Sequence, residues 1–295
     1  WASAPARWRA ASYSRKSPLR AGRYAPLPEF SPGSAGNSAK RPRLAMASNS
    51  YPRLDSTAQT ALLRRIVDRC RFVEGSPRPV VVFDLDGTLM DNRPRSLAIF
   101  DELAAHWKAS RPAESEKLAA ATVDRLQYLV AQSMNALGVE DPAAIKEAEQ
   151  FWKERFFVDE YIRHDIEVPG AVAFAKACWE AGANLAYFTG RDLPNMALGS
   201  FQSLRDLGFP IGCPGTELVC KPYFEMPDEE YKTKEGPSLN RLGRVVAVFD
   251  NEPGNCNTLL KHYEGCDSVF IDTQHFPGAP ALVPAVHIVG DFRLS

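Results

Sequence analysis

The chain has 295 residues, of which 45% are hydrophobic, 24% charged and 10% aromatic, a profile typical of a globular protein of one or two domains. No apolar run approaches the roughly 18 residues of a membrane-spanning helix, which argues against a membrane partner. The net charge of −1 averages two unlike parts, because residues 1–50 carry nine Lys or Arg against Glu29 alone. Residues 51–295 therefore carry −9, which excludes a general attraction for nucleic acid.

The first part, residues 1–50, is rich in Ala, Ser, Pro and Arg and has no helical or alternating period, so we expect a disordered basic leader. The chain begins at Trp1 and Met46 stands just before the first structured segment, which favours an upstream extension that is not native. Two alternatives stay open: an organellar transit peptide, and a short basic address at 40–43. The expected location is cytoplasmic, with organellar import if the leader is a genuine transit peptide.

The cysteines form no C-x-x-C pair and have no His partner at ligand spacing. This pattern predicts free thiols in a reducing compartment and neither disulfides nor a zinc site. They are Cys70, Cys178, Cys213, Cys220, Cys256 and Cys266.

Helices and strands alternate after residue 51. Asp55 or Ser56 can cap a first helix, in which Leu62 and Ile66 recur at helical spacing. Short apolar runs rich in β-formers predict strands at 80–83, 185–188, 217–220, 245–249, 268–271 and 285–289. Helical segments lie between several of them, at 170–180, 193–207 and 253–262. This alternation predicts an α/β fold with a Rossmann-like parallel sheet and helices on both faces.

A segment without strand signals separates the first two strands. Apolar residues between Leu118 and Leu137 follow helical spacing, and 145–162 forms a second, aromatic-rich helical stretch. We therefore expect a leader at 1–50, a core made of 51–90 and 169–295, and an inserted helical cap at 91–168. The cap would leave through a hinge at Val168-Pro169.

Polar residues follow four of the strands at once: Asp84, Thr189, Lys221 and Asp250. Taken singly, such residues are common in turns, on surfaces and at helix caps. In open parallel sheets, however, ligands bind outside the carboxyl ends of the strands. Their position at successive strand ends therefore favours an active site.

Asp84 and Asp86 lie on the same side of an extended segment, and Gly87 permits a tight turn behind them. One carboxylate can attack phosphorus while the other protonates the leaving oxygen. Because a phosphate monoester is a dianion, attack by a carboxylate requires neutralising charge. Mg²⁺ held by the oxygens of Asp84 and Asp250 would supply it.

Further groups can bind the phosphate. Lys221 adds a second positive charge, and the hydroxyl and backbone N–H groups of Thr189 and Gly190 can bind a phosphate oxygen. Arg191 can contact substrate or pair with Asp192, for which we favour the role of helix cap. The stretch 223–243 is longer than a connection requires, and its charged residues favour the surface over the rim of the site.

Four ordered segments resemble the motifs of the haloacid dehalogenase (HAD) superfamily of hydrolases. They are Phe83-Asp84-Leu85-Asp86-Gly87-Thr88-Leu89, Thr189-Gly190-Arg191, Lys221-Pro222 and Phe249-Asp250-Asn251. The resemblance spans residues 79–292 in the right order, with a helical insertion where the C1 cap of that superfamily belongs.

The resemblance implies that Asp84 is the nucleophile that forms an aspartyl-phosphate, and that Asp86 is first the general acid and then the general base. It also implies that Thr189 is a phosphate ligand and that Lys221 stabilises charge. Mg²⁺ would be bound by Asp84, the backbone carbonyl of Asp86, and Asp250. An acid at the position of Asp86 favours phosphoryl transfer to water over dehalogenation.

The fourth motif departs from the pattern of the superfamily, which usually offers a second carboxylate near the first. Asn251 and Asn255 stand at the candidate positions here, with Glu252 between them. An amide oxygen can ligate Mg²⁺ directly or through water, but with less charge. We therefore take Asn251 as the candidate for the remaining ligand and expect weak metal affinity.

These features predict a Mg²⁺-dependent phosphomonoesterase that acts on a small phosphorylated metabolite. The alternatives are a phosphomutase or phosphonatase of the same superfamily, and a non-catalytic HAD-like protein that binds a ligand or partner. The oligomeric state stays open. Candidates for substrate contact from the insertion are Arg93, Arg95, His106, Trp107, Asn135, Trp152, Arg163 and His164.

Overall fold

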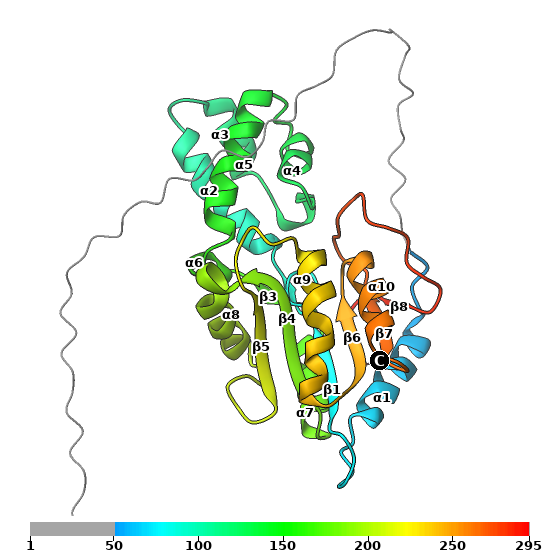
Figure 1. The fold of residues 1–295 in the computed structure, drawn as a ribbon. Helices are drawn as coiled ribbons and strands as arrows, with labels where there is room; N and C mark the ends of the chain where they lie inside the picture. Colours follow the sequence, from blue (N-terminus) through cyan, green and yellow to red (C-terminus); the bar gives the residue numbers. More distant parts are fainter. Residues whose placement is uncertain (1–50, 295) are drawn as a thin grey trace, which may run out of the picture. The chain divides into compact units, whose positions relative to one another are not determined.

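The computed structural model describes residues 51–294, so the expected leader at 1–50 lies outside the described residues. A six-stranded sheet with the order β5-β4-β1-β6-β7-β8 forms the centre of this part, and all of its neighbouring strands run parallel (Figure 1). Its strands are β1 Pro79–Phe83, β4 Asn184–Asp192, β5 Thr216–Lys221, β6 Arg244–Asp250, β7 Asp267–Ile271 and β8 His287–Val289. The predicted α/β fold with a parallel sheet is confirmed.

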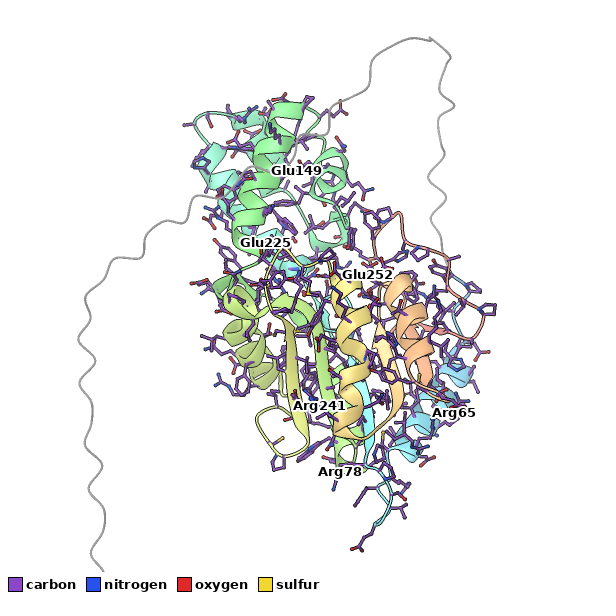
Figure 2. The ribbon with its side chains drawn as sticks, in the orientation of Figure 1. Arg65, Arg78, Glu149, Glu225, Arg241 and Glu252 are labelled. Carbon is purple, nitrogen blue, oxygen red and sulfur yellow. The ribbon has the colours of Figure 1, made fainter. Side chains whose placement is uncertain are left out.

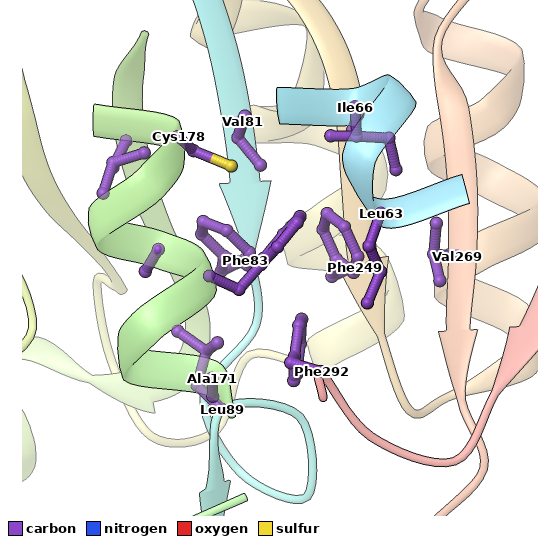
Figure 3. Packing of buried hydrophobic residues seen from close by; sticks show 14 of the residues in the cluster. Leu63, Ile66, Val81, Phe83, Leu89, Ala171, Cys178, Phe249, Val269 and Phe292 are labelled. Carbon is purple, nitrogen blue, oxygen red and sulfur yellow. The ribbon is translucent and has the colours of Figure 1, made fainter. Parts of the chain in front are cut away.

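Helices cover both faces of this sheet. The apolar residues of β1 alternate between the two faces, so each face contributes to a separate core. Val81 and Phe83 pack with α1 and α7 (Figure 3). Val80 and Val82 belong to the cluster on the opposite face. The first core includes residues of α1 Ser56–Arg69, α7 Ala171–Glu180 and α8 Leu193–Leu207. The second includes residues of α9 Asp228–Glu235, the 3-10 helix η2 Gly236–Leu242 and α10 Pro253–His262.

The ends of these helices follow from local sequence. The carboxylate of Asp55 accepts a hydrogen bond from the backbone N–H of Ala58 at 2.8 Å and caps α1. Asp192 caps α8 in the same way through the N–H of Asn195 at 3.2 Å, which confirms the role expected for it. Gly208 ends α8 with a φ of 96°, a backbone conformation that favours glycine.

A helical segment is inserted between β1 and α7. Its elements are α2 Arg93–Trp107, α3 Pro112–Ala119, the 3-10 helix η1 Val123–Arg125, α4 Val130–Ala136, α5 Pro142–Phe156 and α6 Asp159–Ile162. The chain enters through β2 Met90–Asp91 and leaves through β3 Ile166–Glu167, and these two strands pair antiparallel. The insertion has an apolar cluster of its own, which includes Phe100, Trp107 and Met134. The domain limits at 91 and 168 stay a prediction.

The continuous helix expected from Leu118 to Leu137 is wrong. Backbone torsions are extended at Leu126 and Leu129, so a loop separates η1 from α4. The Ser133 hydroxyl stabilises this loop, since it accepts a hydrogen bond from the N–H of Gln127 at 2.9 Å. The apolar residues that suggested one helix therefore lie on three short helical segments, α3, η1 and α4, and in the loops that connect them.

All six cysteines are free thiols, as their spacing predicts. No helix within residues 51–294 combines the length and hydropathy that crossing a membrane requires.

Candidate active site

The site lies at the carboxyl ends of the neighbouring strands β4, β1 and β6, where Thr189, Asp84 and Asp250 occur. These residues line a cavity of about 980 Å³, whose walls also include residues of the helical insertion and of other core loops and helices. Glu252 on the core side and Glu149 on α5 both line this cavity, and Figure 2 labels the two. The cavity therefore lies at the carboxyl ends of the strands, which is where the sequence predicts the site.

A tight turn after β1 presents Asp84 and Asp86 to the cavity. The backbone carbonyl of Leu85 accepts hydrogen bonds from the N–H groups of Thr88, Leu89 and Met90. Gly87 has a φ of +74°, and a β-carbon on it would lie 2.3 Å from Nδ2 of Asn251. The turn therefore requires glycine for both its conformation and its close approach to β6.

Asp84 and Asp250 share one buried ammonium group, that of Lys232 on α9. Lys232 Nζ donates to Asp84 Oδ1 at 2.7 Å and to Asp250 Oδ2 at 2.6 Å. Burial raises the pKa of Asp84 to about 7, although Lys232 opposes this rise. Burial would lower the pKa of Lys232, but Asp250 and Asp84 outweigh it and raise the pKa, so the lysine stays charged.

Lys232 occupies the place that the motif pattern assigned to Lys221. The Lys221 ammonium donates instead to Asp228 Oδ1 at 2.9 Å, and Lys221 does not line the cavity. The expectation that 223–243 lies at the surface is wrong for Lys232, whose exposed fraction is 2%. The one signal for it in the sequence is the neighbouring Tyr231, which anchors α9 through a hydrogen bond to Val219 O at 3.1 Å.

Asp86 forms ion pairs with two arginines. Arg191 holds both of its carboxylate oxygens at 2.7 and 2.8 Å, and Arg95 Nη2 lies 3.0 Å from Oδ1. Burial alone would raise the pKa of Asp86, but Arg191 and Arg95 outweigh it and lower the pKa well below its usual range. Asp86 is therefore ionised in this arrangement, the state of a general base and not of a general acid.

Asp165 completes this network from the end of the insertion. It accepts from Arg95 Nε at 2.8 Å and from Arg191 Nη2 at 2.7 Å, and its side chain is fully buried. Arg95 and Asp165 belong to the insertion segment, whereas Asp86 and Arg191 belong to the strand ends. We call these four residues the Arg–Asp network; its formal charges cancel.

Thr189 and Gly190 lie beside this network on the cavity wall. Thr189 Oγ1 accepts a hydrogen bond from the N–H of Arg191 at 3.2 Å, at the point where the register of β4 against β5 shifts. A β-carbon at Gly190 would lie 2.3 Å from Oδ2 of Asp228. The Asp228 carboxylate thus lies close to the backbone that was expected to bind phosphate.

The two asparagines near Asp250 bind protein groups. Asn251 Oδ1 accepts a hydrogen bond from Thr88 at 3.3 Å, and its Nδ2 donates to Gln274 O at 2.7 Å. Asn255 donates through Nδ2 to Asp250 Oδ1 at 3.1 Å. Asn251 therefore links the turn after β1 to the loop after β7, and its assignment as a metal ligand stays a prediction.

The donor set for a metal consists of few groups. Within residues 51–294 no three His, Cys, Asp or Glu side chains form a metal-binding cluster. Asp84 and Asp250 nevertheless bring two buried carboxylates against a single ammonium, which leaves negative charge uncompensated. A divalent cation held by these carboxylates and the backbone carbonyl of Asp86, with water for the rest, fits this charge and its hard oxygen donors.

Three of the eight candidate contact residues of the insertion lie at or next to the site. Arg93 and Trp152 line the cavity, and Arg95 belongs to the Arg–Asp network. The remaining five are absent from the cavity wall; Trp107 is buried in the core of the insertion. Sequence patterns missed Tyr128, which lies on this wall and whose pKa is raised by burial and by the charge of Glu252.

A family model matches residues 79–214 and is described as hydrolase, haloacid dehalogenase-like hydrolase. This match contains the turn after β1, the whole insertion, β4 and α8. None of the curated proteins matches the sequence.

The chain is also similar, at low sequence identity, to several solved structures. A candidate phosphatase from Clostridium difficile is 15% identical with a TM-score of 0.47, covering 72% of this chain and 94% of its own. A candidate haloacid dehalogenase-like hydrolase from Bacteroides fragilis is 15% identical with a TM-score of 0.41, covering 72% and 96%. The class C acid phosphatase from Bacillus anthracis is 14% identical with a TM-score of 0.37, covering 68% and 66%.

Proposed function

The chain is a member of the haloacid dehalogenase-like hydrolase superfamily, and we propose that it is a Mg²⁺-dependent phosphomonoesterase for a small phosphorylated metabolite. The supporting observation is the pair Asp84 and Asp86, which line one cavity while Lys232 lies 2.7 Å from the first. A nucleophile, a proton-transfer group and a fixed positive charge are thereby within reach of one phosphate.

In the first step of the proposed reaction, an Asp84 oxygen attacks phosphorus and the bond to the ester oxygen breaks. Lys232 neutralises part of the charge near the attacking carboxylate, and Thr189 and Gly190 bind the transferred group. Mg²⁺, when bound by Asp84, Asp250 and the Asp86 carbonyl, would offset the repulsion between carboxylate and phosphate. The departing oxygen takes a proton from the Asp86 carboxyl, which is left ionised for the second step.

In the second step, water attacks the aspartyl-phosphate, and the bond between the phosphoryl group and Asp84 breaks. Asp86 accepts a proton from this water, a role that suits the ionised state in which Arg191 and Arg95 hold it. The same carboxyl has to carry a proton to assist the first step. We therefore expect substrate binding to loosen its arginine contacts.

The proposal includes the organisation of the chain. Residues 51–90 and 169–295 would form the catalytic core, and 91–168 the cap that closes over the substrate. Free thiols at all six cysteines support a cytoplasmic location.

Hydrolysis of para-nitrophenyl phosphate with Mg²⁺, and with EDTA in its place, tests this function. We expect turnover by the wild type that EDTA abolishes, and a loss of about 1,000-fold or more in Asp84→Asn, which cannot attack phosphorus. Asp206→Asn is the matched control, since Asp206 lies exposed in a pair with Arg205. A folded wild type that hydrolyses no member of a broad phosphomonoester panel would refute the proposal.

A further inference from the structure

Large apolar side chains remain exposed on the insertion side of the cavity. Tyr128, Leu129 and Ile166 line it with exposed fractions of 41%, 39% and 50%. A concave wall of exposed apolar groups is typical of a binding site whose ligand covers them. The part of the substrate that faces this wall should therefore be apolar.

Trp152 and Phe157 extend the apolar wall with rings that their neighbours hold in place. Trp152 stacks on Phe156 with ring centroids 4.2 Å apart, and Phe157 meets Trp152 edge-on at 5.5 Å. The indole Nε1 of Trp152 already donates to Ser96 Oγ at 3.0 Å. Because an indole has no other donor, Trp152 offers a ligand ring surface and no hydrogen bond.

Two polar groups near these rings are engaged within the protein. The Arg93 guanidinium donates to both oxygens of Asp91, with a shortest distance of 2.6 Å. Ser96 Oγ accepts from Trp152, whereas the charged side chains of Glu149 and Lys153 line the cavity from other positions of α5. A leaving group with many hydroxyls needs several hydrogen-bond donors and acceptors placed around it on the protein. The part of the wall around Tyr128 and Trp152 offers ring surfaces instead, so it fits an aromatic ring better than a sugar that carries no such ring.

Resting on the proposed function, we infer that the substrate is a phosphate monoester whose leaving group carries a flat aromatic ring. The phosphate would lie at Asp84 and the ring against Tyr128 and Trp152. The cavity volume of about 980 Å³ is large enough for an aryl phosphate and for a nucleoside monophosphate. In the first the ring is the leaving group itself, and in the second it is attached through a sugar.

Calorimetric binding to Asp84→Asn, with and without Mg²⁺, separates recognition from turnover. We expect naphthyl phosphate or uridine monophosphate to bind at least about tenfold more tightly than a hexose phosphate. Tighter binding of naphthyl phosphate would mean that the ring is attached directly to the phosphate. Tighter binding of uridine monophosphate would mean that it is attached through a sugar. Equal affinity for all three esters would overturn the inference. Absence of turnover in the wild type would overturn the proposed function alone, because this preference is measured without turnover.

Variants of Tyr128 test the wall itself. Tyr128→Leu should weaken the preferred aromatic ester about fivefold and leave inorganic phosphate, which does not reach the ring, unchanged. Tyr128→Phe keeps the ring and should keep the preference for the aromatic ester. Phe72→Leu removes an exposed ring outside the cavity and is the control. The inference is contradicted if Tyr128→Leu, at unchanged thermal stability, loses as much affinity for hexose phosphate as for the aromatic ester. It is also contradicted if the variant loses no affinity at all.

Discussion

Lys232 contacts both carboxylates at the centre of the site, and an apolar side chain in its place would leave them without this cation. It joins Asp84 on β1 to Asp250 on β6, so one charge compensates two. Lys221 has a different neighbour, because Asp228 takes its charge. Lys221 at the end of β5 and Lys232 on α9 therefore have unequal electrostatic roles.

Lys232→Met should reduce kcat about 100-fold or more, because it removes positive charge beside the attacking carboxylate. Lys221→Met should reduce kcat less than about tenfold, because Lys221 lies outside the cavity. Steady-state kinetics with para-nitrophenyl phosphate measure both. Lys234→Met, which changes an exposed lysine on the same helix, is the control. Equal losses in the first two variants would contradict the distinction between them.

Gly87→Ala should destabilise the protein and lower turnover, because its β-carbon would collide with Asn251. Gly75→Ala is a matched control: its φ of +84° is similar, but nothing lies within 4 Å of the added carbon. Urea unfolding should show a loss of about 1–2 kcal/mol in the control from backbone strain alone. The loss in Gly87→Ala should exceed this, and a loss no larger than in the control would mean that the contact with Asn251 relaxes freely.

Most polar residues of the site could be predicted from the sequence because each directly follows an apolar strand. Asp84, Thr189 and Asp250 carry this signal, and the structure brings them to one cavity. Lys232 has no such signal, since it lies within a highly charged helix. Which face of α9 packs inward depends on Tyr231 and on the sheet, a tertiary contact that helical spacing does not reveal.

At the scale of elements, the Arg–Asp network fastens the insertion to the strand ends. Arg95 is on α2, Asp165 stands between α6 and β3, and Arg191 belongs to β4. The side chains of Arg95 and Asp165 have no exposed surface, so neither charge has water to compensate it. These contacts fix the part of the insertion that adjoins the strand ends, whereas its outer helices contribute no residue to the network.

Asp165→Asn should cost about 3–5 kcal/mol of the free energy of unfolding, because two buried guanidinium groups lose a charged partner. Chemical denaturation measures this loss. Asp206→Asn makes the same substitution in an exposed pair with Arg205 and should change stability by about 0–1 kcal/mol. If the two variants lose the same stability, the network does not hold the insertion in the way described.

The elements of the core follow from sequence periodicity more closely than those of the insertion. Each strand run is a short segment that is mostly apolar, and the structure contains a strand at all six. In the insertion, the period between Leu118 and Leu137 continues through a loop, because Ser133 supplies hydrogen bonds that a helix backbone would otherwise make. Side-chain bonds of this kind interrupt a helix without interrupting its apolar pattern.

At the scale of the whole molecule, Asp267 connects α1 to the part of the sheet formed by β7 and β8. It begins β7 and pairs with Arg65 and Arg69 of α1, and His287 of β8 lies 3.3 Å away. Burial would raise the pKa of Asp267, but His287, Arg65 and Arg69 outweigh it and lower the pKa. A lowered pKa means that the folded state holds the ionised carboxylate more strongly than the unfolded state does.

The stability that Asp267 contributes should therefore be present above the unfolded pKa of about 4 and be lost as pH falls through the lower folded pKa. At neutral pH, Asp267→Asn should cost about 1 kcal/mol, a small value because solvent screens the half-exposed arginines. Urea unfolding of both proteins at pH values from neutral to about 3 measures the difference, which should shrink in acid. A constant difference across this range would rule out the ion pairs as its source.

The antiparallel pair β2 and β3 also determines how the chain can be divided. Met90 lies opposite Glu167, and Asp91 opposite Ile166, so the two crossings into the insertion leave the core side by side. A short hairpin connection could join them in place of residues 92–165. Such a deletion removes Arg95 and Asp165 together, one charge of each sign, and keeps the pair of Asp86 with Arg191. The removal of the insertion is therefore electrically balanced within the Arg–Asp network, whereas Asp91, which stays with the core, loses its partner Arg93.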